Sequence, residues 1–425
     1  MFGDIPFETE KLHRMAGRQS QTFQAPNGLT LVVERDPTLA EVALAVTIGA
    51  GYCTDPETLP GLSHLVEHLL FEVEKESPFA YGRFVSGRGG RLNAKTFETH
   101  TTFWVVTPPD AFEQVLVFER NRWNAFSVRG QTFGQHVDSI IAEVRARRAE
   151  PFGGFPWPDG AFVPYGHSPY GRDGLGTPAA FKSMSADDAR EHHEAWYIRP
   201  EEMVVAVCGP SAPEEYLSLL ANAFGALPVA QRPLASLPPK TFQGGAVHIC
   251  EQRSRVPRPA TVVFLPIPTI DEDLDAGLAA VVLGEFSLLL LRESFPYASF
   301  SVSAGMLGAF TAKGGDVLVI TALGWPESAA SLSGETARLV SGAAFDAAFR
   351  EARTRTFAHF ATLTTEIEKR AVFLSRLHAF LGMSITISSL AQRLLHTSKE
   401  QTRKVAKKTV EATVGLMQLD SERDE

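Results

Sequence analysis

Cysteine is scarce in this chain of 425 residues, and its three cysteines, Cys53, Cys208 and Cys250, lie far apart. An odd number of widely spaced cysteines provides neither a disulfide framework nor a thiolate metal site. Such usage is typical of proteins in a reducing compartment, and we therefore expect a cytoplasmic location.

Targeting signals and long apolar segments are also lacking. The first residues, Met1–Glu8, do not contain the basic block and apolar block of a secretory signal. The most apolar run, residues 279–291, is interrupted by Glu285 and is too short to span a bilayer. We expect a soluble chain with no membrane partner.

Positive charge is not in excess either. The chain has 40 Lys and Arg against 49 Asp and Glu, and its formal net charge is -9. This balance argues against nucleic acid as the main partner.

The length of the chain predicts two to four structural units. We interpret the segment 227–245, which holds four prolines, as a linker between an N-terminal domain, residues 1–226, and a C-terminal domain, residues 246–425. Strand-like and helical segments follow a similar order on both sides of it, which suggests a structural duplication. In the second half we expect strands at 247–251, 261–266, 300–304 and 317–322, and helices that include 273–290 and 365–380.

The pentapeptide His64–His68 carries the clearest chemistry in the sequence. In a helix, His64 and His68 are one turn apart and project from the same face, which is the spacing at which two imidazoles hold a divalent metal. Glu67 lies on the same side and can reach a metal-bound water; this order, H-x-x-E-H, occurs in zinc peptidases. The alternative is an amphipathic helix whose histidines form hydrogen bonds in a core.

A zinc peptidase site needs a third protein ligand, and Glu143 is the natural candidate. It lies in the helical segment 140–144 among apolar neighbours, where an acid needs a specific role.

With these residues in place, the chain resembles the pitrilysin/insulinase family of zinc peptidases in its shorter, two-domain form that is similar to the processing peptidases. In that family a glutamate ligand follows the inverted motif by about seventy-five residues, where Glu143 stands. Further matching stretches are Gly90–Thr96, His167–Arg172 with Gly174–Thr177, and Tyr197–Pro200 before Met203–Val205. Together they cover roughly residues 25–225.

The resemblance implies a fold, a site and a cofactor. The fold is α+β, with two similar domains, each a mainly antiparallel sheet with helices packed on one face. The cofactor is Zn²⁺, held by His64, His68 and Glu143, with Glu67 as the general base. The strand around Asn93 and Ala94 would receive a peptide as an added strand, although Asn93 has the alternative of being an ordinary turn or strand-edge residue.

Two departures from the family pattern are present. His136 stands where the family usually has a second glutamate, and it could support the site from behind the ligands or be a surface histidine. In the C-terminal domain, Arg292 matches a substrate-binding arginine, but Ser299 stands at the spacing expected for its partner tyrosine.

The incomplete second pair suggests an assembly. We expect this chain to be the metal-bearing subunit of a heterodimer with a homologous, metal-less partner, and a homodimer is the second choice. The predicted activity is that of a zinc-dependent endopeptidase acting on peptides or short unfolded segments in a closed chamber. The alternative is a non-catalytic scaffold subunit of the same fold. His192 and His193 lack ligand spacing, and we expect them to be solvated.

Overall fold

The computed structural model describes most of the chain. The described residues are 18–72, 80–124, 126, 128, 130–150, 159–229, 237–243, 248–253, 258–342, 345–382 and 385–421. The first eighteen residues therefore lie almost entirely outside the described part, as do segments of the predicted linker.

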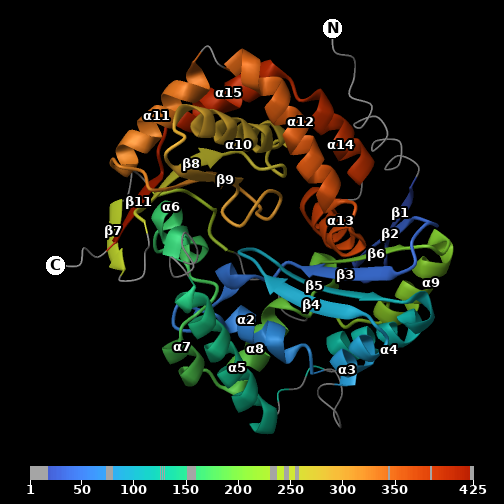
Figure 1. The fold of residues 1–425 in the computed structure, drawn as a ribbon. Helices are drawn as coiled ribbons and strands as arrows, with labels where there is room; N and C mark the ends of the chain where they lie inside the picture. The colour runs from blue at the N-terminus through green and yellow to red at the C-terminus, as the bar shows by residue number, and fades with distance from the viewer. Residues whose placement is uncertain are drawn as a thin grey trace. The chain divides into compact units, whose positions relative to one another are not determined.

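The main elements of the first half are the strands of the first sheet and the helices that lie between or after them in the sequence (Figure 1). They are β1 Gln19–Gln24, β2 Thr30–Arg35, β3 Val42–Ile48, α2 Leu62–Leu69, α3 Ala80–Gly87, β4 Arg91–Thr96, β5 Thr101–Thr107, α4 Phe112–Asn124, α5 Gly130–Ala149, α6 Phe162–Tyr165, α7 Pro178–Ser183, α8 Ala186–Trp196, β6 Met203–Gly209 and α9 Pro213–Phe224.

The second half adds five strands and six helices to the described structure. They are β7 His248–Arg253, β8 Ala260–Ile267, α10 Leu274–Ser294, β9 Ser299–Ala304, β10 Asp316–Leu323, α11 Ala329–Ser341, α12 Phe345–Leu363, α13 Ile367–Leu381, α14 Ile387–His396, α15 Lys399–Val410 and β11 Gly415–Ser421. The last helix and the last strand were not predicted.

The two sheets share one topology. The first has the order β1-β2-β6-β3-β5-β4 and the second has the order β7-β11-β8-β10-β9. When the extra strand β1 is set aside, the last strand of each half, β6 or β11, lies between the first two strands of that half. It is parallel to the first strand, β2 or β7, and antiparallel to the second, β3 or β8. The third strand, β4 or β9, lies at the far edge. This common order confirms the predicted α+β class with two similar, mainly antiparallel sheets, and it supports the suspected duplication.

The chain forms two compact units, and neither is continuous in sequence. Unit 1 comprises Met1–Glu143, Gly174–Leu237 and Ala361–Leu390, and unit 2 comprises Val144–Asp173, Pro238–Phe360 and Ala391–Glu425. The predicted division at 227–245 was linear, so it differs from the structure at residues 144–173 and 361–390.

The end of the predicted linker is packed rather than extended. The side chain of Gln243 donates hydrogen bonds to the carbonyl groups of Phe162 and Val163, and its backbone N–H donates to Pro164. Tyr170 donates to the carbonyl of Pro238. These contacts make residues 238–243 part of unit 2.

Helix α13 explains why unit 1 includes residues 361–390. It packs on β3, β5 and β6, whereas α2, α3, α4 and α9 lie on the other side of this sheet (Figure 1). Every residue of β3 is buried, as expected for a strand covered on both faces. Thr47 and Ser375 are hydrogen-bonded at 2.7 Å, and the residues that share the face of Thr47 on β3 are Ala43 and Ala45, small enough for close helix packing.

A buried ion pair fixes the start of α13 on the sheet. The guanidinium of Arg370, whose side chain is 1% exposed, lies 3.0 Å from Glu34 and 3.3 Å from Asp36. Both carboxylates belong to β2 or the residue after it, so this contact ties the C-terminal half of the sequence to the second strand of the chain.

In unit 2, the long helix α10 packs against β9, α11 and α15. It is the one described helix with the length and composition to cross a membrane, and 61% of its apolar window is buried inside the protein. Its packing is that of the core helix of a sheet.

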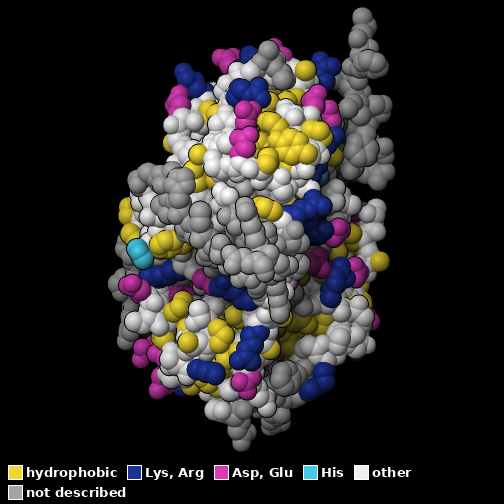
Figure 2. Space-filling model, turned by 60° about the vertical axis from the view of Figure 1, so that its left-hand side comes forward, with side chains coloured by type: hydrophobic (Ala, Val, Ile, Leu, Met, Phe, Trp, Pro, Cys, Tyr) yellow, Lys and Arg dark blue, Asp and Glu magenta, His cyan; other side chains and the backbone are white. Residues whose placement is uncertain are grey.

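On the face drawn in Figure 2, basic and acidic side chains are interspersed, so neither sign of charge forms a continuous patch there.

We expect Arg370→Leu to lower the free energy of unfolding by about 3 kcal/mol, because it removes the nearer cation of the buried Glu34 carboxylate and leaves Glu34 and the half-buried Asp36 with Arg18 alone. Arg338→Leu is the matched control, since Arg338 is 63% exposed and its pair with Glu335 should contribute less than about 1 kcal/mol. Urea unfolding of both variants measures the difference. Equal effects would show that the buried pair does not anchor α13.

Candidate metal centre

One buried carboxylate holds the beginning of α2. Asp55, which is 2% exposed, accepts hydrogen bonds from the backbone N–H of Gly61 at 2.7 Å and of Ser63 at 2.8 Å, and from the Ser63 hydroxyl at 2.6 Å. These N–H groups have no partner within the helix. Gly61 has a φ of 93°, and a Cβ there would lie 2.7 Å from the ring of Phe181, so this turn requires glycine.

Helix α2 then presents its two histidines to a carboxylate of α5. The rings of His64 and His68 have their centroids 5.0 Å apart and are nearly perpendicular. Glu143 Oε2 lies 3.7 Å from His64 Nε2 and 3.5 Å from His68 Nε2. One potential ligand atom from each residue lies within 4.8 Å of the others, and among the described residues no other three such side chains gather this closely.

The spacing of these three groups fits a zinc ion. The two distances to Glu143 are too long for good hydrogen bonds. Four ligands placed tetrahedrally at zinc bond lengths lie about 3.4 Å from one another, which is close to the observed values. Burial lowers the pKa of His64, and the neutral imidazole that this favours is the form that binds metals. Two imidazoles and one carboxylate leave a fourth position for water.

Glu67 projects from the same helix but lies outside the group of three. It is 6% exposed, and its Oε2 accepts a hydrogen bond from the Thr96 hydroxyl at 2.6 Å. Thr96 is the last residue of β4, so this contact joins the helix of the two histidines to the edge strand of the first sheet.

Asn93 and Ala94 lie on that edge strand. Among the strands that the structure describes, β4 pairs with β5 alone, so no described strand occupies its other side. Asn93 is exposed and its Oδ1 accepts a hydrogen bond from the backbone N–H of Ala94 at 2.9 Å. By alternation along the strand, Ala94 shares the face of Thr96, and Asn93 shares the opposite face with Arg91, which pairs with Glu368 of α13.

Two family models match this chain. Residues 30–151 match the family model described as insulinase (peptidase family M16), and residues 183–303 match the model described as peptidase M16 inactive domain. The chain belongs to the insulinase family, M16. The family inferred from the motifs of the sequence is therefore confirmed.

Relatives of this insulinase-family chain include zinc proteases. An uncharacterized zinc protease of Mycobacterium leprae is 27% identical over 240 residues, which are 55% of this chain and 52% of that protein. A probable mitochondrial-processing peptidase subunit beta of Arabidopsis thaliana is 22% identical over 249 residues, 56% of this chain and 45% of that protein. The chain thus matches about half the length of these relatives.

A solved structure shows the same fold over nearly the whole chain. The crystal structure of a protease from Helicobacter pylori superposes with a TM-score of 0.80 at 18% sequence identity. The match covers 95% of this chain and 100% of that chain.

His136, the first departure from the insulinase-family pattern, is buried rather than on the surface. Its Nε2 lies 2.6 Å from Glu72 Oε1, and its ring is 6.4 Å from that of His68, edge to face. Thr132 donates to the other oxygen of Glu72 at 2.9 Å. The pair of His136 and Glu72 therefore lies next to His68. The family pattern expects a glutamate on α5, whereas here the carboxylate is that of Glu72, which follows α2.

Arg292, the second departure, belongs to unit 2 and forms a hydrogen bond within that unit. It is exposed at the end of α10, and its guanidinium donates a hydrogen bond to the carbonyl of Phe300 at 3.1 Å. Ser299, at the spacing of the expected tyrosine, is exposed at the start of β9, and Tyr297 is 58% exposed.

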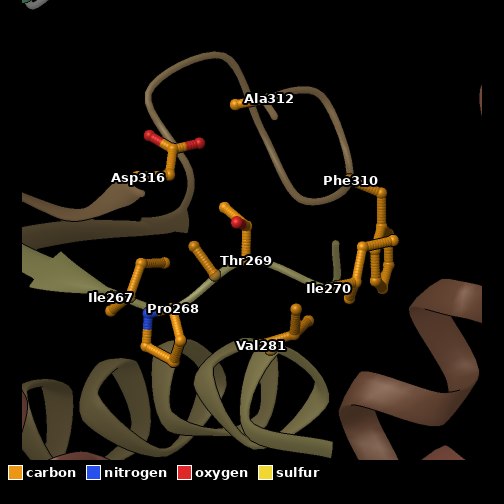
Figure 3. Close-up of a pocket in the computed structure, with 10 residues that line it drawn as sticks. Ile267, Pro268, Thr269, Ile270, Val281, Phe310, Ala312 and Asp316 are labelled. Carbon is orange, nitrogen blue, oxygen red and sulfur yellow. The ribbon is translucent and has the colours of Figure 1, made fainter. Parts of the chain in front are cut away.

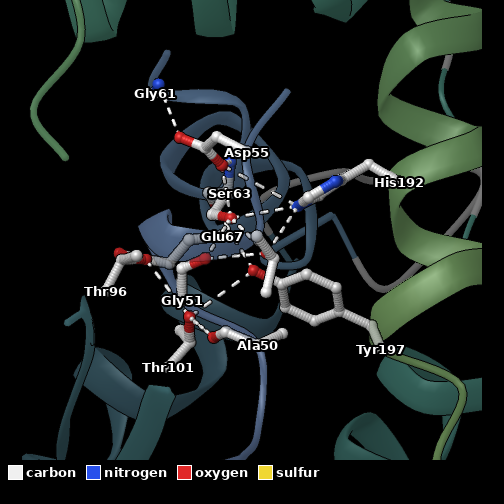
Figure 4. Close-up of polar contacts among 11 residues, drawn as sticks. Ala50, Gly51, Asp55, Gly61, Ser63, Glu67, Thr96, Thr101, His192 and Tyr197 are labelled. Atoms are coloured by element: carbon white, nitrogen blue, oxygen red, sulfur yellow. Dashed lines mark hydrogen bonds and ion pairs between the residues drawn. The ribbon is translucent and has the colours of Figure 1, made fainter. Parts of the chain in front are cut away.

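The expectation that His192 and His193 are solvated is wrong. They are 5% and 3% exposed, and His192 Nε2 lies 3.0 Å from the Ser63 hydroxyl (Figure 4). Because the single proton of that hydroxyl is best placed to reach Asp55, the imidazole acts as the donor to Ser63 Oγ. His193 stacks on Tyr197, with ring centroids 5.8 Å apart. Helix α8 thus supports the first turn of α2.

Asp55, Glu72 and Thr96 were not among the site residues predicted from the sequence. Asp55 precedes α2 by several residues, and only the reversal of the chain at Gly61 brings it to the helix start. Thr96 lies in the stretch that carried the family resemblance, three residues after Asn93, but nothing in its spacing indicates a contact with Glu67.

Another hollow, in unit 2, is a weaker candidate (Figure 3). Its lining is largely apolar, and the residues drawn there include Ile267, Val281 and Phe310. Its acid, Asp316, already accepts hydrogen bonds from the backbone N–H groups of Met306 and Val317. This arrangement serves the loop before β10 and offers little to a ligand.

The buried histidines predict a pH dependence of stability. Burial lowers the pKa of His192 to about 4, whereas histidine in an unfolded chain titrates near 6.5. Between these values the unfolded state binds more protons, so stability falls as the pH is lowered from about 6.5 to about 4. We expect His192→Gln to weaken this dependence in thermal unfolding from pH 7 to pH 4.5.

The matched control is His396→Gln, because His396 is exposed on α14. It should show the pH dependence of the wild type. If His192→Gln did the same, the buried imidazole would not be the group that couples folding to protonation.

Proposed function

We propose that the chain is a zinc-dependent endopeptidase that hydrolyses peptides or short unfolded segments in a closed chamber. The observation that carries this proposal is that Glu143 of α5 lies beside His64 and His68 of α2, and that Glu67 lies on the same turn of α2 as the two histidines. The names of its relatives support zinc and proteolysis.

His64, His68 and Glu143 would hold the zinc ion. When bound, zinc lowers the pKa of a coordinated water towards neutrality and polarises the carbonyl of the scissile bond. The neutral state that burial favours for His64 makes its imidazole available for this role.

Glu67 would act as the general base and then as the general acid. It takes a proton from the attacking water as the new carbon–oxygen bond forms. It gives this proton to the amide nitrogen when the carbon–nitrogen bond breaks, so the products are a carboxylate and an amine. Its burial and its fixed contact with Thr96 suit a base that must face one direction.

The peptide would add as a strand along the open side of β4. Main-chain hydrogen bonds then supply affinity with little sequence preference. The N–H of Ala94, which Asn93 holds through its side chain, would be one of the donors released to the peptide. Such binding selects extended, unfolded segments over folded ones.

We further propose that the chain works as the metal-bearing subunit of a pair with a homologous, metal-less partner, in the cytoplasm. Arg292 is engaged by the carbonyl of Phe300, and Ser299 replaces the expected tyrosine, so a second chain would supply the missing substrate contacts. One relative is named as a subunit, which fits this arrangement. A homodimer is the second choice.

Glu67→Gln should lower kcat for peptide cleavage by at least about 100-fold, because it removes the general base. Zinc content should stay at the wild-type level, since Glu67 is outside the group of ligands and glutamine can still accept from Thr96. The comparison is His68→Ala, which should lose both zinc and activity. Cleavage that survives in Glu67→Gln would favour a different mechanism. Zinc binding by the wild type without any cleavage, either alone or mixed with a homologue that lacks the two histidines, would favour the scaffold role.

The proposed assembly predicts that the chain alone cleaves slowly or not at all, and that a homologue lacking the two histidines restores cleavage when mixed with it. Light scattering on a sizing column, with peptide cleavage measured across the peak, tests both points. Full activity in a monomer peak would exclude the paired arrangement, and activity in a peak of two identical chains would favour the homodimer.

A further inference from the structure

The contact between Thr96 and Glu67 is short and well placed. The Thr96 hydroxyl lies 2.6 Å from Glu67 Oε2, and within the described part of the chain Oε1 has no hydrogen bond (Figure 4). The two oxygens of the carboxylate therefore have different surroundings, one engaged by the sheet and one left open.

Counting protons fixes the direction of this hydrogen bond. A hydroxyl has one proton, and an ionised carboxylate has none to give, so Thr96 is the donor. The Thr101 hydroxyl lies 3.4 Å from Thr96, but its own proton goes to the carbonyl of Ala50 at 2.7 Å. Thr96 therefore has Glu67 as its one strong acceptor.

The surroundings of Thr96 are themselves tied to α2. Thr96 and Thr101 face each other across the β4–β5 pair. The Thr101 hydroxyl lies 3.4 Å from that of Tyr197, which donates to the carbonyl of Ser63 at 3.3 Å. Since the protons of Thr101 and Tyr197 go to these carbonyl groups, the 3.4 Å contact between the two hydroxyls is not a second strong hydrogen bond. Tyr197 thus holds the Ser63 end of the turn that carries His64 and Glu67, and Thr96 holds the Glu67 end.

Gly51 allows this close approach. A Cβ at residue 51 would lie 2.5 Å from backbone atoms of Phe97, Glu98 and His100, in the turn that joins β4 to β5. Any other residue would push the β4–β5 turn away from α2.

We propose that Thr96 is a positioning residue that holds Glu67 through Oε2 and leaves Oε1 as the oxygen that takes the proton from water. This inference rests on the proposed function of Glu67. In the step itself, the water O–H bond breaks and the Oε1–H bond forms, while the hydrogen bond from Thr96 to Oε2 is kept. Because Thr96 ends the strand that takes the peptide, substrate and base share one rigid support.

The test uses two substitutions at residue 96 and a control. Thr96→Val removes the hydroxyl and keeps the shape, and Thr96→Ser restores a donor. The control is Thr102→Val. Thr102 follows Thr101 on β5 and points to the opposite face of the sheet, where its hydroxyl lies 2.9 Å from that of Thr47. Valine is favourable in strands, so folding should be preserved at residue 96.

We expect Thr96→Val to lower kcat by about 10- to 100-fold with KM unchanged, as is found when a catalytic group loses its orientation. Thr96→Ser should recover most of this loss, and Thr102→Val should keep the wild-type kcat. Zinc affinity, measured by chelator competition, should be the same in all four proteins because Thr96 touches no ligand of the cluster.

A measurement without substrate separates this inference from the proposed function. The infrared difference between zinc-free wild type and Glu67→Gln isolates the carboxylate bands of Glu67, and these should shift in Thr96→Val but not in Thr102→Val. If Glu67→Gln abolishes cleavage while Thr96→Val leaves both kcat and the bands unchanged, the role of Thr96 is overturned and the peptidase proposal stands. If the bands shift but the wild type cleaves nothing, either alone or mixed with a homologue that lacks the two histidines, the contact is real and the peptidase proposal fails, together with the catalytic role of Thr96.

Discussion

The position of one short helix turn governs the candidate site, and the Asp55 carboxylate holds that turn. Helix α2 has only eight residues, which is too few to be stable by itself in water. Its place depends on the hydrogen bonds to Asp55, on packing against α8 and on contact with β4. His64, Glu67 and His68 share this turn, so whatever fixes it fixes all three with respect to Glu143.

Two buried histidines around α2 are each paired with another polar side chain, which limits the cost of their burial. His192 meets Ser63, and His136 meets Glu72. The low pKa of His192, caused by burial, keeps this imidazole neutral. The first turn of α2 therefore gains a polar contact from α8 without an added positive charge.

The sequence predicted the three converging side chains because local spacing determines two of them. Residues i and i+4 meet on any helix, so His64 and His68 needed no knowledge of the fold. Glu143 was reached through an isolated acid among apolar neighbours and the family resemblance. His192, Thr96 and Glu72 could not be found in this way, because their partners lie 129, 29 and 64 residues away and the contacts depend on sheet register and helix packing. For the same reason the sequence placed α13 with the C-terminal domain although it packs on the first sheet, since its amphipathic pattern shows that it packs but not on which sheet.

Because α13 packs on the first sheet, the two halves of the sequence could not be made as independent polypeptides without exposing part of each. The shared strand order suggests an ancestral module used twice, and a module can in principle be made as a separate polypeptide. Here a fragment ending near residue 226 would lack the helix that covers Ala43, Ala45 and Thr47, and would expose that face of its sheet together with the carboxylate of Glu34. The complementary fragment would carry an amphipathic helix without a surface to cover. The two fragments would therefore be obligate partners, and the chain is better understood as a covalently joined pair than as two independent domains.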